Sequence, residues 1–179
     1  MKLHRAAIRL AAILVVAAFT SVTVLAQNGP KLTDPEIASI AVTANQIDVN
    51  YGKNALAKLH NPDVKHFAET MIKDHEAIIK QATELAAKLG VKPKTNPTTK
   101  SLLKAEKETN AKLAKVKGEA YDKAYIDNEV AYHESVINTV NNVLIPQTTN
   151  AELKDFLVKA GPLLNHHLEM AKMAQSKVK

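Results

Sequence analysis

Three histidines of this 179-residue chain stand where an amphipathic helix normally has a leucine or an isoleucine. On three separate predicted helices, His75, His133 and His167 each continue an apolar line whose residues recur at spacings of three, four and seven. On the apolar line of a fourth predicted helix stands a carboxylate, Asp48. Because the apolar face of such a helix packs against the core, the pattern predicts that three imidazoles and one carboxylate are buried.

The four side chains also lie at similar depths along their helices. Asp48 follows the start of its predicted helix by 14 residues, His75 by 13, His133 by 14 and His167 by 17. At about 1.5 Å of rise per residue, each lies roughly 20–25 Å along a helix of about 40 Å. Mid-helix positions stay at one level whichever way each helix runs, so we expect the four side chains to converge.

Three neutral imidazoles and a carboxylate form a donor set that suits zinc, copper or iron. Glu129, four residues before His133 on the same helix face, is a candidate ligand or a group that orients the imidazole. Met71 and Met170 carry thioethers near the same level. They are candidate ligands only if the metal is copper, because thioethers favour Cu(I).

A second interpretation of these residues needs no metal. Buried histidines can satisfy one another and a carboxylate in a hydrogen-bonded polar layer, and methionines on such a line usually fill the core. The sequence leaves both interpretations open. Two other histidines are expected to lie outside the cluster, since His66 is nine residues from His75 and points outward, and His166 is one residue off the apolar line.

The elements that must position these residues are helices. Beyond residue 26 the chain is rich in Ala, Leu, Lys and Glu and shows no alternating strand pattern. Capping residues, prolines and glycines divide it into four long helices, predicted over residues 34–60, 62–89, 119–145 and 150–175. The sequence therefore predicts an all-α fold, a four-helix bundle in a single domain over residues 27–179.

Residues 91–118 connect the second long helix to the third and form a lysine-rich crossover. From Lys92 to Lys117 there are eight lysines and only two acidic residues, Glu106 and Glu108. The polar part of this segment is expected to form a shorter helix. Its charge is typical of a solvated surface or, alternatively, of a docking site for an anionic partner.

Residues 1–26 have the pattern of a secretory signal peptide. Three basic residues precede an apolar run, and Val24 and Ala26 stand at the −3 and −1 positions of a cleavage site. An uncleaved membrane anchor is the alternative, and the run is short for it, because a spanning helix needs about 20 apolar residues. We expect cleavage after Ala26, a periplasmic or secreted mature protein, and no transmembrane segment in the mature chain.

The composition excludes several classes of protein. The sequence has 24 basic and 18 acidic residues, and three of the basic ones lie in the leader, which leaves the mature chain a net charge of +3. Such a mild charge, with few aromatic residues, argues against nucleic-acid binding. Because the chain has no cysteine, disulfides and thiolate metal sites are excluded as well.

Three blocks of the sequence resemble the bacterial family called domain of unknown function 4142, often labelled an outer-membrane protein. They read NPDVKHFAETMIKDHEAIIKQATELAAKLGV, YDKAYIDNEVAYHESVI and AELKDFLVKAGPLLNHHLEMAKMA. The resemblance covers most of the mature chain and is most specific at Asp74-His75, at the Tyr121 block before His133, and at His167. It implies a ferritin-like helical bundle and a location in the cell envelope.

The histidines do not stand in a di-iron motif. Ferritin-like di-iron proteins carry Glu-x-x-His on two helices. Here the residue three positions before each histidine is apolar: Ile72, Val130 and Leu164. A ferroxidase or di-iron oxygenase is therefore disfavoured, and no nucleophile or paired acidic site at readable spacing indicates another enzyme.

These observations favour a non-catalytic periplasmic bundle with a buried histidine layer that binds a transition metal, serving metal handling or envelope stress. The alternative is an interaction module, in which the lysine-rich crossover contacts an anionic envelope component or a protein partner. The identity of the metal and the oligomeric state are not determined by the sequence.

Overall fold

The computed structural model describes residues 31–178, and every regular element in this part of the chain is helical. The all-α class predicted from the sequence is therefore confirmed. In chain order the elements are α1 (Asp34–Ala55), α2 (Pro62–Lys88), α3 (Pro97–Leu113), α4 (Glu119–Thr139), the π-helical turn η1 (Val140–Leu144), α5 (Ile145–Gln147) and α6 (Ala151–Gln175). The predicted signal peptide, residues 1–26, lies outside the described residues.

Asparagines begin three of the helices. The side chain of Asn61 accepts hydrogen bonds from two backbone N–H groups of α2, that of Asn96 accepts one from α3, and that of Asn150 accepts one from α6. A side-chain oxygen at this position satisfies N–H groups that have no partner within the helix. After α2 the chain turns at Gly90, whose positive φ of 65° suits a residue without Cβ.

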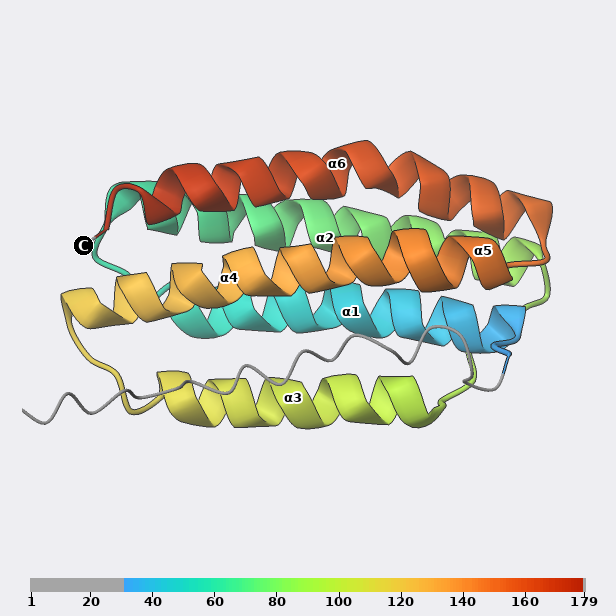
Figure 1. Cartoon of the computed structure of the whole chain (residues 1–179), viewed down its shortest axis with the longest axis horizontal. Helices are drawn as coiled ribbons and strands as arrows, with labels where there is room; N and C mark the ends of the chain where they lie inside the picture. Colours follow the sequence, from blue (N-terminus) through green and yellow to red (C-terminus); the bar gives the residue numbers. More distant parts are fainter. Residues whose placement is uncertain (1–30, 179) are drawn as a thin grey trace, which may run out of the picture.

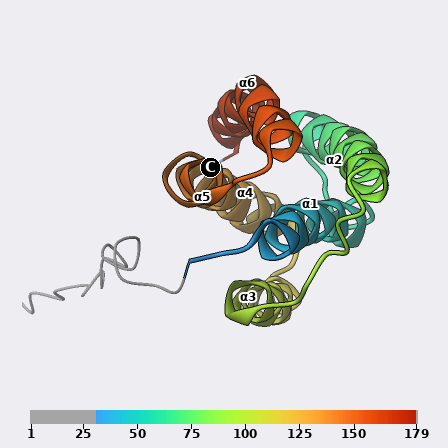
Figure 2. The same cartoon turned by 90° about the vertical axis from the view of Figure 1, so that its right-hand side faces the viewer.

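The helices run alongside one another (Figure 1). α1 packs against α2, α4 against α6, and α2 against α6, while α3 packs against α1. Seen along the helix axes, α3 lies below α1, on the side away from α6 (Figure 2). The predicted cluster lies on four of these helices, α1, α2, α4 and α6.

The predicted count of four helices is wrong, because the described residues form five. Since α4, η1 and α5 follow one another without a break, they count as one helix, and α3 is the fifth. The shorter helix expected in the polar part of residues 91–118 is present as α3. Asn96 caps it, and Leu102 and Leu113 supply an apolar side that packs against the core.

Two helix ends differ from the prediction. α1 ends at Ala55 rather than at residue 60. The buried carboxylate of Asp122 accepts the N–H groups of His60 and Asn61, so these two residues are held outside the helix. The third long helix continues beyond Pro146, the residue expected to stop it. A proline ring clashes with the carbonyl four residues earlier in an α-helix, and the wider turn of η1 relieves that clash.

The apolar core falls into two clusters, and the histidines lie between them. On α6, Ala171 belongs to the cluster that includes Phe67 and Tyr125, whereas Leu164 belongs to the cluster that includes Ile37 and Leu144. His167 stands between Leu164 and Ala171 in the sequence. The fold therefore places a layer of polar side chains between the two apolar clusters, near the middle of the helices.

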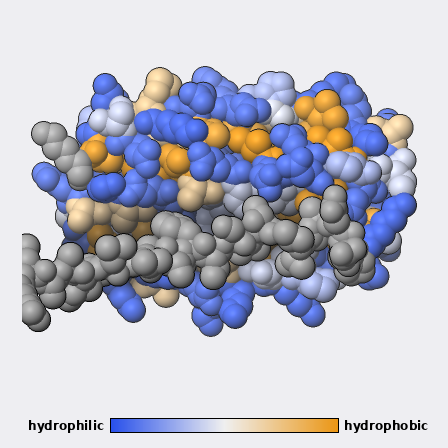
Figure 3. Space-filling model, viewed as in Figure 1, coloured by the Kyte–Doolittle hydropathy of each residue, from blue (hydrophilic) through white to orange (hydrophobic). Residues whose placement is uncertain are grey.

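The surface is mostly hydrophilic, with hydrophobic residues visible along α6 and where it meets α4 (Figure 3). Val158 and Met173, both on α6, are more than half exposed. Among residues 31–178, no helix combines the length and apolar character that crossing a bilayer requires.

Candidate metal centre

Four helices each bring one predicted side chain into the polar layer. Asp48 comes from α1, His75 from α2, His133 from α4 and His167 from α6. None is more than 2% exposed. Both the burial and the convergence expected from the sequence are thus observed.

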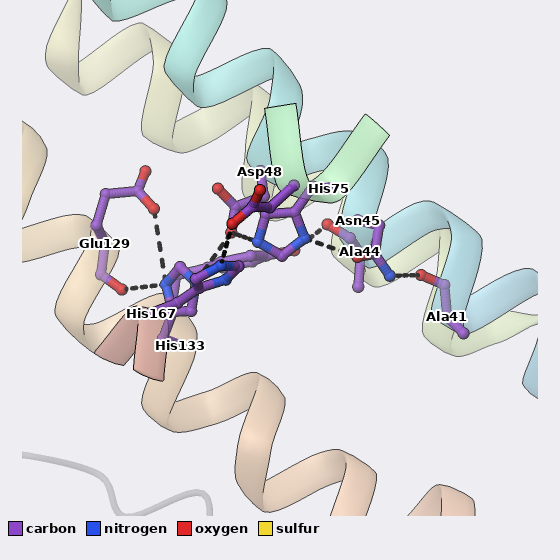
Figure 4. A network of polar contacts seen from close by, with 10 residues as sticks. Ala41, Ala44, Asn45, Asp48, His75, Glu129, His133 and His167 are labelled. Atoms are coloured by element: carbon purple, nitrogen blue, oxygen red, sulfur yellow. Dashed lines mark hydrogen bonds and ion pairs between the residues drawn. The ribbon is translucent and has the colours of Figure 1, made fainter. Parts of the chain in front are cut away.

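The three imidazoles face one another within a single small volume (Figure 4). The ring centroids of His75 and His167 are 5.0 Å apart, those of His133 and His167 are 5.7 Å apart, and those of His75 and His133 are 5.8 Å apart. One ring nitrogen of each histidine lies within 4.8 Å of one from each of the others. Three nitrogen donors are therefore gathered around one point.

One nitrogen of His75 and one of His133 contact an oxygen acceptor outside the cluster. His75 Nδ1 lies 2.7 Å from Asn45 Oδ1, and His133 Nδ1 lies 3.0 Å from the backbone oxygen of Glu129. The amide nitrogen of Asn45 donates to the Ala41 carbonyl, so its oxygen is the acceptor toward His75. Each Nδ1 therefore carries the proton, and each Nε2 keeps its lone pair.

His167 is held by its other nitrogen. Its Nε2 donates to Asp74 Oδ2 at 3.1 Å, and Asp74 is only partly buried. This leaves Nδ1 of His167 as the nitrogen with a lone pair. Within the described part of the chain, three buried ring nitrogens have no hydrogen-bond partner: Nε2 of His75, Nε2 of His133 and Nδ1 of His167.

Asp48 lies against two of these nitrogens. Its Oδ2 is 3.3 Å from Nε2 of His75 and 3.4 Å from Nε2 of His133, while its Oδ1 has no partner among residues 31–178. Burial raises the pKa of the Asp48 carboxyl to about 8. A single proton on Asp48 can satisfy only one of the two nitrogens.

Burial also keeps the histidines neutral. It lowers the pKa of His133 to about 4, lowers that of His75 well below the usual range, and lowers that of His167. The neighbouring imidazoles depress the pKa of His75 further. Neutral imidazole is the form of histidine that binds a metal.

A second carboxylate stands beside the layer. Glu129 is fully buried, its Oε2 lies 3.8 Å from Nδ1 of His133, and neither carboxyl oxygen has a hydrogen-bond partner among the described residues. Burial and the nearby Asp48 raise its pKa well above the usual range. Asp48, Glu129 and His133 also bring ligand atoms within 4.8 Å of one another. Glu129 is therefore placed as the sequence predicted.

The other candidates have different surroundings. Met71 is fully buried in the apolar cluster of Phe67 and Tyr125, and Met170 packs at the edge of that cluster. His66 and His166 are exposed, as expected.

The sequence reasoning missed two residues that orient the site. Asn45 stands three residues before Asp48 on α1, and Asp74 directly precedes His75 on α2 while contacting His167 on α6. The i,i+3 spacing of Asn45 and Asp48 was a readable signal. The contact of Asp74 with another helix depends on how the helices pack, and no spacing within the sequence shows it.

The geometry offers three nitrogen donors and one carboxylate in a dry interior, with outer hydrogen bonds on the far side of each ring. Ligating histidines usually donate their second N–H to a carboxylate, a backbone carbonyl or a similar acceptor, which fixes the ring and its tautomer. All three histidines have such a partner. The arrangement could hold a four-coordinate transition metal.

Fold and site together define an all-helical protein with a buried layer of three histidines and two carboxylates. The family described as Domain of unknown function (DUF4142) matches residues 20–174, and the chain belongs to that family. The resemblance noted in the sequence is therefore confirmed. No curated protein and no solved structure matches the chain.

Proposed function

We propose that this protein binds one transition-metal ion through His75, His133, His167 and Asp48, and that it serves metal handling without catalysis. The proposal treats α1, α2, α4 and α6 as a ferritin-like four-helix bundle, with α3 packed outside it. It also adopts the secretion expected from residues 1–26, so that the metal would be handled in the periplasm.

The observation that carries the proposal is the set of three unpartnered nitrogens, Nε2 of His75, Nε2 of His133 and Nδ1 of His167. An unsatisfied buried polar atom costs about 1–3 kcal/mol. In a metal-free layer, a proton on Asp48 would satisfy one of the three and leave two without a partner. A metal ion accepts all three lone pairs and the carboxylate at once.

The donor set and its size favour an ion of the zinc or copper kind. Imidazole suits zinc, copper and iron, and the Irving–Williams order places Cu²⁺ above Zn²⁺ and Fe²⁺. Two nitrogens bound to one tetrahedral zinc ion are about 3.3 Å apart, given Zn–N distances of about 2.0–2.1 Å. One nitrogen of each histidine already lies within 4.8 Å of one from each of the others, so side-chain shifts on the order of 1 Å would bring three nitrogens to this spacing.

Metal analysis and thermal titration test the proposal. Protein purified without a His-tag should contain close to one equivalent of metal, measured by mass spectrometry. After removal of the metal, stoichiometric Zn²⁺, Cu²⁺, Fe²⁺ or reductant-maintained Cu(I) should raise the melting temperature, since a ligand that binds only the folded state stabilises it. If none of the four ions raises it, the metal proposal is wrong and a metal-free polar layer takes its place.

Site variants distinguish this centre from adventitious binding. His133→Ala should abolish the rise in melting temperature, whereas His66→Ala should leave it unchanged, because His66 is exposed on α2. If both substitutions reduced the metal-induced rise in melting temperature equally, the metal would be assigned to the surface.

A second candidate function concerns α3. The lysines of this helix lie on its exposed side, while its apolar side faces the core. Asn50 on α1 donates to Glu106, which ties the helix down. A basic surface fixed in this way would suit an anionic envelope component or a protein partner.

A further inference from the structure

A cavity of about 100 Å³ adjoins the histidine layer. On α1 its lining runs from Ile40 to Asp48, and on α4 and η1 it runs from Tyr132 to Leu144. Eight residues of α1 correspond to about 12 Å along the helix axis. The cavity is therefore elongated and leads away from the metal centre toward the end of the molecule where α1 begins.

The walls of this cavity are predominantly apolar. The aliphatic side chains come from α1, α4, η1 and α6, and they include Ile40, Val136, Val140, Leu157 and Leu164. The π-helical turn η1 supplies the lining at Val140 and Leu144. π-Helical turns inside α-helices are frequent at functional sites, and here the turn shapes the wall of a cavity.

One end of the cavity is polar. Asp48, His75 and His133 line it there, and each has a buried atom without a hydrogen-bond partner among the described residues: Oδ1 of Asp48 and Nε2 of the two histidines. Along the apolar walls an apolar group is favoured over water, because a water molecule needs two or more polar partners. The nitrogens therefore present hydrogen-bond acceptors to whatever occupies the cavity.

We propose that this cavity is a binding site for a small neutral molecule that has an apolar body and one hydroxyl group, the class of short alcohols. The hydroxyl would donate to Nε2 of His75 or His133, and the apolar body would lie between Val136, Val140 and Leu164. The proposal concerns the metal-free protein, because a bound metal ion would take the lone pairs of the same two nitrogens.

Size and charge restrict the ligand. A cavity of about 150 Å³ lined by aliphatic and aromatic residues holds benzene, which has six non-hydrogen atoms, so about 100 Å³ suits a molecule of roughly four or five. An anion is excluded, because it would lack the donor and would lose its hydration next to the buried carboxyl group of Asp48.

The test uses metal-free protein, 1-butanol as the probe and sodium butyrate as its anionic counterpart. Methyl NMR spectra should show saturable shifts of the Val136, Val140 and Leu164 signals with 1-butanol, at a dissociation constant in the millimolar range expected of so few atoms. Butyrate at the same concentrations should produce none. Equal binding of butyrate would overturn the assignment of a neutral donor, and the absence of saturable shifts with 1-butanol would overturn the site.

A filled cavity gives the matched comparison. Ala160→Leu adds a branched side chain to the cavity wall and should weaken 1-butanol binding at least tenfold. Ala82→Leu, the same change at a half-buried alanine in a separate, smaller cavity between α1 and α2, should leave binding unchanged. Should Ala160→Leu fail to fold, nuclear Overhauser contacts between bound 1-butanol and the methyls of Val140 and Leu164 decide the matter in the wild type. Contacts only to residues outside the cavity would contradict the proposal.

Discussion

Nε2 of His75 lies 3.3 Å from Oδ2 of Asp48, although both atoms present lone pairs when the proton of His75 is on Nδ1, which donates to Asn45. Two acceptors at this separation require something positive between them. A proton on Asp48 is one solution, and burial raises the pKa of Asp48 to about 8 in accordance with it. A metal ion is the other, and it also serves His133 and His167. The choice between proton and metal decides what the layer does.

The substitution His75→Leu separates the two solutions. In a metal-free layer, leucine continues the apolar line of α2 and removes a buried polar group, so the melting temperature should stay within a few degrees of wild type or rise. In a metal site, the same change removes a ligand, and the rise in melting temperature caused by the metal should disappear. Thermal unfolding with and without the metal measures both effects. A full metal-induced rise in His75→Leu would remove His75 from the ligand set.

Asp74→Ala tests the outer hydrogen bond on His167. Asp74 accepts the Nε2 proton of His167 and so directs Nδ1 into the cluster. Loss of such a partner typically lowers metal affinity about 10- to 100-fold, measured by competition with a chelator of known affinity. Glu76→Ala is the control, because Glu76 is an exposed carboxylate on the same helix and pairs only with Lys53. Equal affinities of the two variants would show that Asp74 does not orient the site.

Much of this site could be predicted from periodicity alone. The apolar lines identified His75, His133 and His167, and comparable depth placed Asp48 beside them. Both inferences use only the geometry of single helices, which the sequence determines locally. The same reasoning predicted a helix at α3 but not its packing against α1, because a polar helix with only one apolar side gives no signal of the helix it contacts.

Contacts between helices were beyond this reasoning. Three features depend on how side chains from different helices meet. They are the pairing of Asp74 with His167, the contact of Asp122 with the chain that follows α1, and the cavity beside the histidines. The π-helical turn arises from a proline that the sequence interpreted as a stop. Met71 and Met170 were assigned to the level of the site from spacing, and the structure places both with the apolar cluster.

Stability of the metal-free protein should fall as the pH rises from about 6.5 to 8. Asp48 keeps its proton in the folded state up to a pKa of about 8, while in the unfolded chain it is ionised above about 4. The unfolded state then binds fewer protons, so stability falls with pH, by about 1.4 kcal/mol per unit for one full proton. The histidines act in the opposite direction only below about 6.5, since burial lowers their pKa values.

Asp48→Asn isolates this contribution, because the amide resembles the protonated carboxyl and does not titrate. Denaturant unfolding at pH 6.5, 7 and 8 should show a flatter decline in the variant than in wild type. Parallel declines in the two proteins would show that Asp48 is already ionised in the folded state.

Neutralising four lysines of the 91–118 crossover should affect binding and not folding. Lys104, Lys107, Lys112 and Lys115 are all exposed, and surface changes usually alter stability by less than about 0.5 kcal/mol each. If they form a docking surface, the variant with four glutamines should bind envelope fractions more weakly and with less dependence on salt.

The control for this variant carries the same change of charge elsewhere. Glutamine replaces four exposed lysines on α2 and α6: Lys65, Lys73, Lys80 and Lys154. Equal binding by the two variants would mean that net charge, rather than α3, governs attachment, and the second candidate function would be discarded.

Gly52 lets α1 approach α2 closely. A Cβ at this position would lie 2.8 Å from Cγ1 of Ile72 and 3.1 Å from the backbone oxygen of Ala68, and the backbone cannot rotate away as a side chain can. Gly52→Ala should therefore destabilise the protein by about 1–3 kcal/mol through overpacking, despite the better helix propensity of alanine. Because α1 carries Asp48 and α2 carries His75, the same shift should also weaken metal binding.

Gly161→Ala is the matched control on α6, where a Cβ meets nothing within 4 Å. Its gain in propensity is offset by the restriction that Pro162 places on the preceding residue, so its stability should stay within about 1 kcal/mol of wild type. Chemical denaturation of both variants measures the difference, and a Gly52→Ala protein as stable as Gly161→Ala would mean that the two helices can move apart without cost.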